Sequence, residues 1–290
     1  MELTAQGLTK RYGNFTALSD VSFSIKKNGC YGYLGPNGAG KTTTMKLFTN
    51  LLHPTSGAAI VNGINVNRRP LDALKNVSSL VEDPLPYDFM TVREFVSFAA
   101  KIRGVGQPDL GDLKDRLDLP DLDKSVSKLS KGQKRRVYLA ALAAQESEIL
   151  ILDEPTSGLD PKESIVIRDF LRDAKGDKII LLSSHLLYEV SQVCDYVYFL
   201  YNGRLTDQGT LSEIQLRYTS KVLRVEFFGE VDLKELGLDM RKENGSTYLV
   251  YFDGSDQERR RILDRLYPLG LRSFGDAELG LEEAYRKVIG

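Results

Sequence analysis

The segment Gly35-Pro36-Asn37-Gly38-Ala39-Gly40-Lys41-Thr42 satisfies the pattern G-x-x-x-x-G-K-[ST]. It follows the apolar run Tyr31 to Leu34 and precedes a segment in which Met45, Phe48 and Leu52 recur at helical spacing. A strand, a glycine-rich loop and a helix in this order predict a P-loop, whose backbone N–H groups and helix amino end hold phosphate oxygens. The sequence therefore predicts an α/β protein that binds a nucleoside triphosphate.

The residues of this loop have distinct expected roles. Lys41 is expected to reach the β and γ phosphates, and the hydroxyl of Thr42 is expected to bind Mg²⁺. Thr43 lies one residue further into the same helix end. The loop residues expected to surround the phosphates are Gly35, Pro36, Asn37, Gly38, Ala39 and Gly40. The loop by itself does not indicate which nucleotide base is bound.

Two further strand ends carry polar side chains that fit nucleotide hydrolysis. The apolar run Ile149 to Leu152 ends in Asp153 and Glu154. Mg²⁺ needs hard oxygen ligands, so Asp153 is expected to bind the metal, and Glu154 is expected to orient or deprotonate the attacking water. Ile179 to Leu182 is followed by His185, which is expected to hydrogen-bond a γ phosphate at the same sheet edge. The predicted catalytic residues are thus Lys41, Glu154 and His185.

The pattern of the whole chain predicts two domains. Residues 1–218 alternate short apolar runs with helical segments, which is typical of a largely parallel sheet. Alternating strands near Leu3 to Arg11 and Val21 to Lys26 predict an antiparallel layer. The segment from about 84 to 145 predicts an inserted helical subdomain, whose first helix is expected to begin with a capping box from Thr91 to Glu94. Residues 219–290 predict a small α+β domain with a last helix near Leu281 to Val288.

Composition limits the partners and the compartment. The chain has 39 basic and 40 acidic side chains and a net charge of -1, so no nucleic-acid partner is expected. Cys30 and Cys194 are the only cysteines, which excludes a disulfide framework. No apolar run approaches the roughly 18 residues of a membrane helix, and the first ten residues do not resemble a secretory signal. We therefore expect a cytoplasmic protein whose membrane role depends on a partner.

A third motif makes the resemblance to a known family specific. Leu129-Ser130-Lys131-Gly132-Gln133 predicts a helix start with a capping box from Ser130 to Gln133. Together with the phosphate loop before it and Leu152 to Asp160 after it, this run resembles the signature sequence of ABC ATPases. The carboxyl-terminal domain, with Leu281-Glu282-Glu283-Ala284-Tyr285 near its end, is similar to the small extension of drug-exporter-type ABC ATPases. The fold that this resemblance implies is a P-loop NTPase with an inserted helical subdomain, an antiparallel β layer and a small C-terminal α+β domain.

The resemblance also implies residue roles. Two ATP-binding domains of this family pair head to tail, so Ser130, Gly132 and Gln133 of one chain would face the ATP held by the other. Tyr12 resembles the aromatic residue that stacks on adenine, 157–160 resembles the loop that communicates across the dimer, and His185 resembles the switch histidine. Glu82 stands where the family has a glutamine that contacts Mg²⁺ or water. Lys131 stands where the family usually has glycine.

These features predict the ATP-hydrolysing subunit of an ABC transporter, with ATP and Mg²⁺ as cofactors. Its expected partners are a second ATP-binding subunit and separate integral membrane permease subunits, which would hold it on the inner face of the cell membrane. Export is the expected direction. The alternative is a soluble ABC-type mechanochemical ATPase in DNA repair or translation, but the segment between Lys41 and Asp153 is too short for long coiled coils, and the chain has one ATPase unit. A non-hydrolysing sensor is disfavoured by Glu154, and a metabolic kinase by the signature run.

Overall fold

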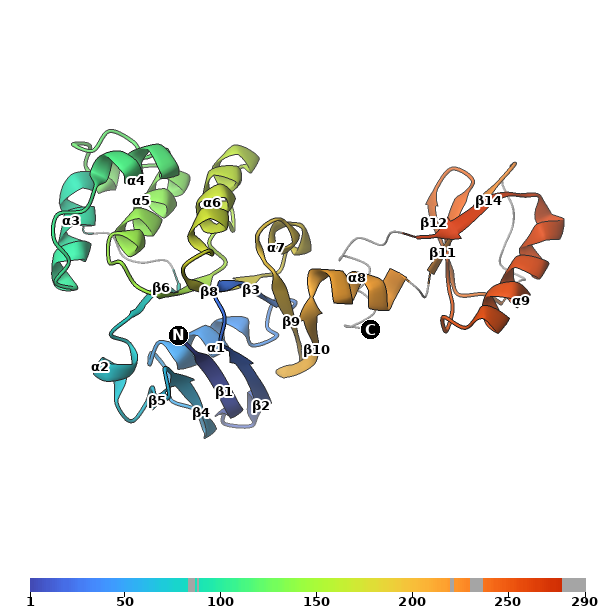
Figure 1. The fold of residues 1–290 in the computed structure, drawn as a ribbon, viewed down its shortest axis with the longest axis horizontal. Coiled ribbons are helices and arrows are strands. Elements are labelled where there is room, and N and C mark those ends of the chain that lie inside the picture. The colour runs from blue at the N-terminus through green and yellow to red at the C-terminus, as the bar shows by residue number, and fades with distance from the viewer. Residues whose placement is uncertain (83–86, 88, 220–221, 230–236, 278–290) are drawn as a thin grey trace. The chain divides into compact units, whose positions relative to one another are not determined.

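The chain divides by its contacts into two units, Met1–Gln208 and Gly209–Gly290, which are described separately (Figure 1). The computed structural model describes residues 1–82, 87, 89–219, 222–229 and 237–277. The sequence places the domain boundary at 218, whereas the contacts group α8 (Leu211–Thr219) with the second unit.

A six-stranded sheet forms the centre of the first unit, in the order β10-β9-β3-β8-β7-β6. The apolar runs of the sequence are its central strands. Their bounds are β3 (Gly29–Leu34), β6 (Val77–Leu80), β7 (Ile149–Asp153), β8 (Ile179–Ser184), β9 (Tyr196–Tyr201) and β10 (Arg204–Thr210). Asn202 and Gly203 have positive φ angles (47° and 72°), as a type I′ turn between β9 and β10 requires.

The register of this sheet brings the sequence motifs together. β3 and β8 are parallel with Leu34 opposite Ser184, and β7 and β8 are parallel with Asp153 opposite Ser183. All three strands therefore end at one edge. Because the phosphate loop, Glu154 and His185 each follow one of these strands, they emerge side by side, although they lie far apart in the sequence.

An antiparallel sheet in the order β2-β1-β4-β5 confirms the predicted second layer. Its strands are β1 (Leu3–Tyr12), β2 (Phe15–Ile25), β4 (Ser56–Val61) and β5 (Ile64–Asn65). A core shared with α1 (Lys41–Phe48) centres on Phe23, whose ring centroid lies 5.7 Å from that of Phe48 and 4.9 Å from that of Tyr198. Tyr33 joins this cluster, and burial raises its pKa well above its ordinary value.

The predicted helical subdomain consists of α3 (Val92–Ile102), α4 (Leu110–Leu117), a 3₁₀ turn at Val126–Lys128 and α5 (Lys131–Ala143). Figure 1 shows these helices gathered on the side of the parallel sheet away from the antiparallel layer. Capping boxes form between Thr91 and Glu94 and between Ser130 and Gln133, as the sequence predicts. Arg103 donates to the carbonyls of Leu74 and Lys75 after α2 (Pro70–Ala73), which ties the subdomain to the sheet.

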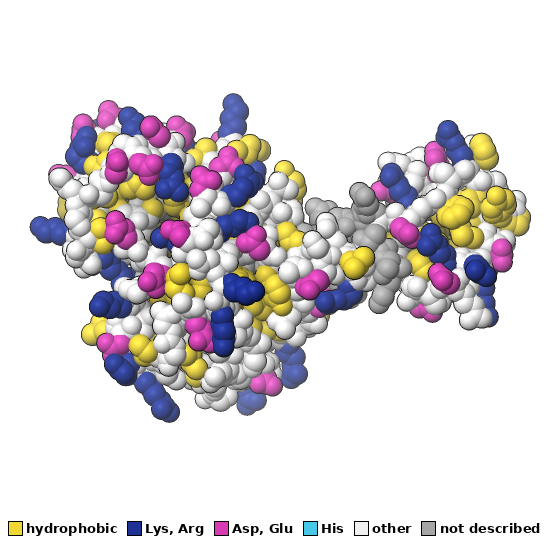
Figure 2. Space-filling model, viewed as in Figure 1, with side chains coloured by type: hydrophobic (Ala, Val, Ile, Leu, Met, Phe, Trp, Pro, Cys, Tyr) yellow, Lys and Arg dark blue, Asp and Glu magenta, His cyan; other side chains and the backbone are white. Residues whose placement is uncertain are grey.

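The surface mixes charges of both signs. Figure 2 shows Lys and Arg interspersed with Asp and Glu over the visible face of the first unit. Exposed pairs such as Arg69 with Asp72 (2.8 Å) and Arg172 with Asp169 (2.7 Å) belong to this pattern. In the described part of the chain, no helix is both long enough and apolar enough to span a bilayer.

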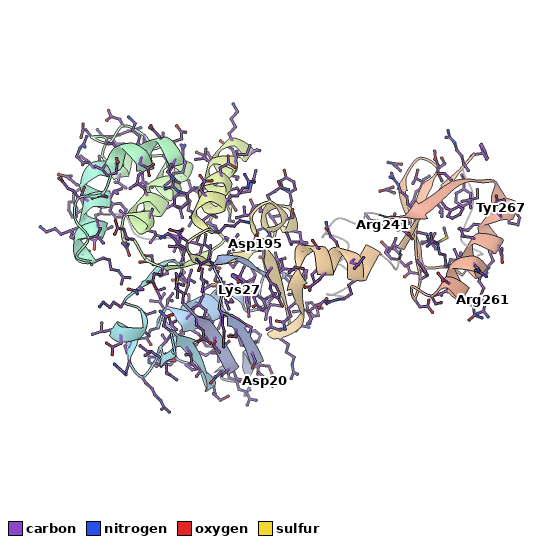
Figure 3. All side chains as sticks on the ribbon, viewed as in Figure 1. Asp20, Lys27, Asp195, Arg241, Arg261 and Tyr267 are labelled. Carbon is purple, nitrogen blue, oxygen red and sulfur yellow. The ribbon has the colours of Figure 1, made fainter. Side chains whose placement is uncertain are left out.

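The short helix α7 (Leu187–Val193) packs directly on β3, the strand that leads into the phosphate loop. A Cβ on Gly32 would lie 2.4 Å from Cγ1 of Val190, so only glycine permits this approach. The free thiols of Cys30 and Cys194 are in contact, with their sulfurs 3.2 Å apart. Asp195, labelled in Figure 3, accepts a hydrogen bond from the backbone N–H of Cys30 at 3.0 Å. The start of β3 is therefore fixed by α7 and by Cys194 and Asp195, which follow α7.

The second unit contains a four-stranded antiparallel sheet in the order β12-β13-β11-β14. Its elements are β11 (Val222–Phe227), β12 (Met240–Asn244), β13 (Thr247–Tyr251), α9 (Asp256–Leu266), a 3₁₀ turn at Tyr267–Leu269 and β14 (Leu271–Asp276). Ile262 and Leu266 of α9 pack on Leu223, Val225 and Val250 of the sheet. This is the α+β arrangement that the sequence predicts. The predicted last helix near Leu281 lies outside the described residues.

Candidate functional site

The phosphate loop adopts a backbone that requires glycine at its ends. Gly40 has a φ of 108°, and a Cβ at this position would lie 2.6 Å from the carbonyl oxygen of Ala17. A Cβ on Gly35 would lie 2.3 Å from the carbonyl oxygen of Leu200. Gly40 is also the N-cap residue of α1, so the loop delivers the chain directly to a helix amino end. Backbone N–H groups and the helix dipole together favour an anion there.

Lys41 is a buried cation held at the base of this loop. Its side chain is 5% exposed, and its Nζ donates to the carbonyl oxygens of Gly35 (2.9 Å) and Pro36 (3.2 Å). Oε1 of Glu154 lies 3.3 Å from the same Nζ. A buried ammonium is costly unless it has a counter-charge, and in this structure Glu154 supplies it.

Thr42 and Asp153 meet across the sheet edge. The Thr42 hydroxyl donates to Oδ2 of Asp153 at 2.7 Å, although the two residues come from α1 and β7. Both are hard oxygen ligands, and Mg²⁺ in proteins commonly takes one or two such side chains, together with substrate phosphates and water. The two side chains therefore fit the Mg²⁺ role that the sequence assigns to them.

Glu154 is held in a backbone conformation that side chains rarely adopt. Its φ is 44°, in the left-handed region, which costs of order 1–3 kcal/mol and persists only where neighbours fix it. Its N–H donates to the Ser183 hydroxyl at 3.0 Å, and its Oε2 lies 3.0 Å from Nδ1 of His185. The Glu154 carboxylate thus lies between Lys41 on one oxygen and His185 on the other.

Ser183 is a functional residue that the sequence analysis missed. Its hydroxyl accepts from the Glu154 N–H and donates to Oδ1 of Asp153, so one side chain orients both acidic residues. It is fully buried at the end of β8. A serine pair that ends an otherwise apolar strand, just before His185, was the available signal.

The other residues that the sequence singles out lie apart from this centre. Tyr12 ends β1 and is 46% exposed, and the Lys10 ammonium lies 5.0 Å from the centroid of its ring. Glu82 forms an ion pair with Lys46. Among the described residues it makes no hydrogen bond to Thr42 or Asp153. Ser130, Gly132 and Gln133 form the amino end of α5 and share no hydrogen bond with the phosphate loop in the part of the chain that the structure describes.

The fold and the site define a P-loop nucleotide hydrolase, and comparisons with known proteins extend this conclusion. The family model for ABC transporters matches residues 18–157. The bacitracin transport ATP-binding protein BcrA of Enterococcus faecalis is 32% identical over 299 residues, covering 99% of this chain and 96% of that protein. The lantibiotic transport ATP-binding protein SrtF of Streptococcus pyogenes is 33% identical over 236 residues, covering 81% of this chain and 95% of that protein.

Solved structures agree. An ATP-binding subunit of an ABC transporter superposes with a TM-score of 0.69 at 29% identity, covering 75% of this chain and 93% of that one. A dimeric ATP-binding cassette with ADP and phosphate shares the fold, with a TM-score of 0.64 at 20% identity, over 72% of this chain and 98% of that one.

The chain belongs to the ABC transporter family as an ATP-binding and ATP-hydrolysing subunit. Three predictions from the sequence are thereby confirmed, namely the drug-exporter type of the family, the fold and the ATPase activity. The comparisons support the transporter function and not the alternative of a soluble ATPase in DNA repair or translation.

Lys41→Ala should abolish ATP binding, because the phosphates lose their buried counter-charge. We expect affinity to fall by at least about 100-fold, in keeping with loss of a charge-assisted contact in a buried site. Isothermal titration calorimetry measures this directly. Lys178→Ala is the matched control, since Lys178 donates to the Ser147 carbonyl near the opposite end of β8. Equal affinities in the two variants would contradict the role of Lys41.

Ser183→Ala should weaken both the fold and catalysis. The change leaves the Glu154 N–H and one Asp153 oxygen without the Ser183 hydroxyl, which costs about 1–3 kcal/mol of unfolding free energy. ATPase activity should fall with it because both acidic side chains lose a fixed orientation. Urea unfolding and steady-state hydrolysis test the two effects. Ser191→Ala is the control, since its hydroxyl only donates to the nearby Tyr188 carbonyl on the surface of α7.

Proposed function

We propose that this chain energises export of a peptide antibiotic, or a compound of similar chemistry, through separate membrane subunits. The observation that carries this proposal is the match to the bacitracin transport protein, which extends over 99% of this chain and therefore includes the second unit. A lantibiotic transport ATP-binding protein is a second relative, which matches over 81% of this chain. The proposed work of the chain is to convert ATP binding and hydrolysis into closing and opening of a subunit pair.

Exchange of the partner of Lys41 is the proposed first step. The ammonium is now balanced by Glu154, and the β and γ phosphates of ATP would offer it a larger negative charge at the same loop. Lys41 would then leave Oε1 of Glu154, while His185 keeps its contact with Oε2. The freed oxygen is the one that would accept a proton from the attacking water.

Hydrolysis would follow as an in-line attack by that water on the γ phosphorus, with cleavage of the bond to the β–γ bridging oxygen. Mg²⁺, when bound, neutralises charge on the phosphates. Thr42 and Asp153 would hold the ion, and the proposed contact of Glu82 requires it to leave Lys46. His185 would fix the orientation of Glu154 and contact the γ phosphate.

Pairing with a second ATP-binding subunit is part of the proposal. Ser130, Gly132 and Gln133 of one chain would close over the γ phosphate on the other, and Tyr12 would stack on the adenine. The amino end of α5 supports this, because a helix amino end favours a phosphate. The partner is either an identical chain or a related one.

The helical subdomain is the proposed contact with the membrane subunits. Phe89 is 79% exposed, and it borders a hollow of about 450 Å³ whose lining includes Met90, Phe98 and Lys101 of the same region. Exposed aromatic side chains around a hollow are typical of a protein interface. This contact would hold the chain at the inner face of the cell membrane. The mixed surface charge in Figure 2 gives no basis for a nucleic-acid partner.

Glu154→Gln should bind ATP with near-normal affinity and hydrolyse it at least about 100-fold more slowly, because the amide cannot accept the proton of the attacking water. A dimer should accumulate in ATP. Calorimetry, single-turnover hydrolysis and light scattering measure the three properties. Wild-type turnover in this variant would remove Glu154 from the proposed mechanism.

Affinity purification of Glu154→Gln from gently solubilised native membranes tests the transport assignment. With ATP, this variant should retain a polytopic membrane protein in stoichiometric amount, as identified by mass spectrometry. Lys41→Ala is the control, since it should not close around ATP. Reproducible recovery of ribosomal or DNA-repair proteins with no membrane protein would contradict the proposal.

A further inference from the structure

The first turn of α6 (Pro161–Ala174) departs from the helix starts described above. Asp160 caps this helix by accepting from the Glu163 N–H at 2.8 Å. In the capping boxes of α3 and α5 the N3 side chain reaches back to the N-cap backbone, but Glu163 does not. Its half-buried carboxylate points across to α5 instead, and the structure gives it no hydrogen bond or ion pair with any described residue.

The Glu163 carboxylate lies where a side chain at position 132 would begin. A Cβ on Gly132 would be 1.9 Å from the carboxyl carbon and from both oxygens of Glu163. Cα–Cβ bonds in a helix tilt toward its amino end, so the Glu163 carboxylate lies on the side of Gly132 that faces the amino end of α5. The Ser130 hydroxyl satisfies the Gln133 N–H, while the described residues offer no acceptor to the backbone N–H groups of Lys131 and Gly132. A negative group therefore already occupies the end of the helix that favours an anion.

A positive group lies beside it. The Lys131 side chain extends to the loop before α6, where a Cβ on Gly158 would be 2.7 Å from its Nζ. Lys131 is exposed and has no ion-pair partner among the described residues. Lys131 and Glu163 thus bring opposite charges to one helix end, and glycines at 132 and 158 leave the space for them.

We propose that Glu163 competes with the γ phosphate of the partner subunit's ATP for the amino end of α5, and that Lys131 favours the phosphate. This inference rests on the head-to-tail pairing proposed above. Two anions cannot share the place without repulsion, so closure of the dimer requires the Glu163 carboxylate to move away. In the separate subunit, Glu163 holds the helix end; in the closed pair, the phosphate takes it. The pair of charges therefore sets the ATP concentration at which the subunits close.

Opposite shifts in ATP-driven dimerisation test this inference. In the Glu154→Gln background at fixed protein concentration and low ionic strength, Glu163→Gln should lower the ATP concentration for half-maximal dimer by about two- to fivefold. Lys131→Met should raise it by a similar factor, the size expected for one charge at a helix end. Light scattering or sedimentation measures the dimer. ATP affinity of the dilute monomer should be unchanged in both, because α5 acts on the partner's nucleotide.

Matched controls remove the same charges elsewhere in the full chain. Asp173→Asn acts at the far end of α6, and Lys114→Met acts on the exposed face of α4; neither should shift the midpoint. An unchanged or raised midpoint for Glu163→Gln would overturn the inference while leaving head-to-tail pairing intact. If the parent Glu154→Gln protein fails to dimerise at any ATP concentration, the proposed pairing itself is overturned, and the inference with it. Thermal unfolding of each variant confirms that it is folded.

Discussion

The balance of charge on the buried Lys41 ammonium is the interaction on which the site depends. A cation at 5% exposure cannot lose its counter-charge without a large cost, so whatever negative group stands nearest is held firmly. In the free subunit that group is Glu154. The same residue that is expected to activate water is therefore occupied until phosphate arrives. In the proposed mechanism, nucleotide binding would release this carboxylate from Lys41.

The sheet register makes that balance possible. Asp153 opposite Ser183 and Leu34 opposite Ser184 place the ends of three strands at one edge. The cost of the left-handed conformation of Glu154 is offset by its bonds to Ser183 and His185, which fix the carboxylate between a cation and an imidazole.

Charge also links the ends of α5 and α6. Glu163 and Lys131 lie at a helix end that is expected to receive a phosphate, and each occupies space left by a glycine. In the first unit, a carboxylate thus lies at two places where a phosphate of ATP is expected to bind. At the phosphate loop a carboxylate pairs with the cation that ATP needs, and at α5 a carboxylate occupies the place that the γ phosphate is expected to take. In both cases a negatively charged phosphate of ATP would displace the carboxylate.

Features that depend on residues close together in the chain could be predicted from the sequence. The spacing of Gly35, Gly40 and Lys41 predicted a P-loop, the caps at Thr91 and Ser130 predicted helix starts, and apolar runs predicted the buried strands. Contacts between side chains from distant segments were visible only in the folded chain. The bridging role of Ser183, the ion pair of Lys41 with Glu154 and the approach of Glu163 to Gly132 each join segments that are distant in the chain. Strand order, register and helix packing set those distances, and no local pattern encodes them.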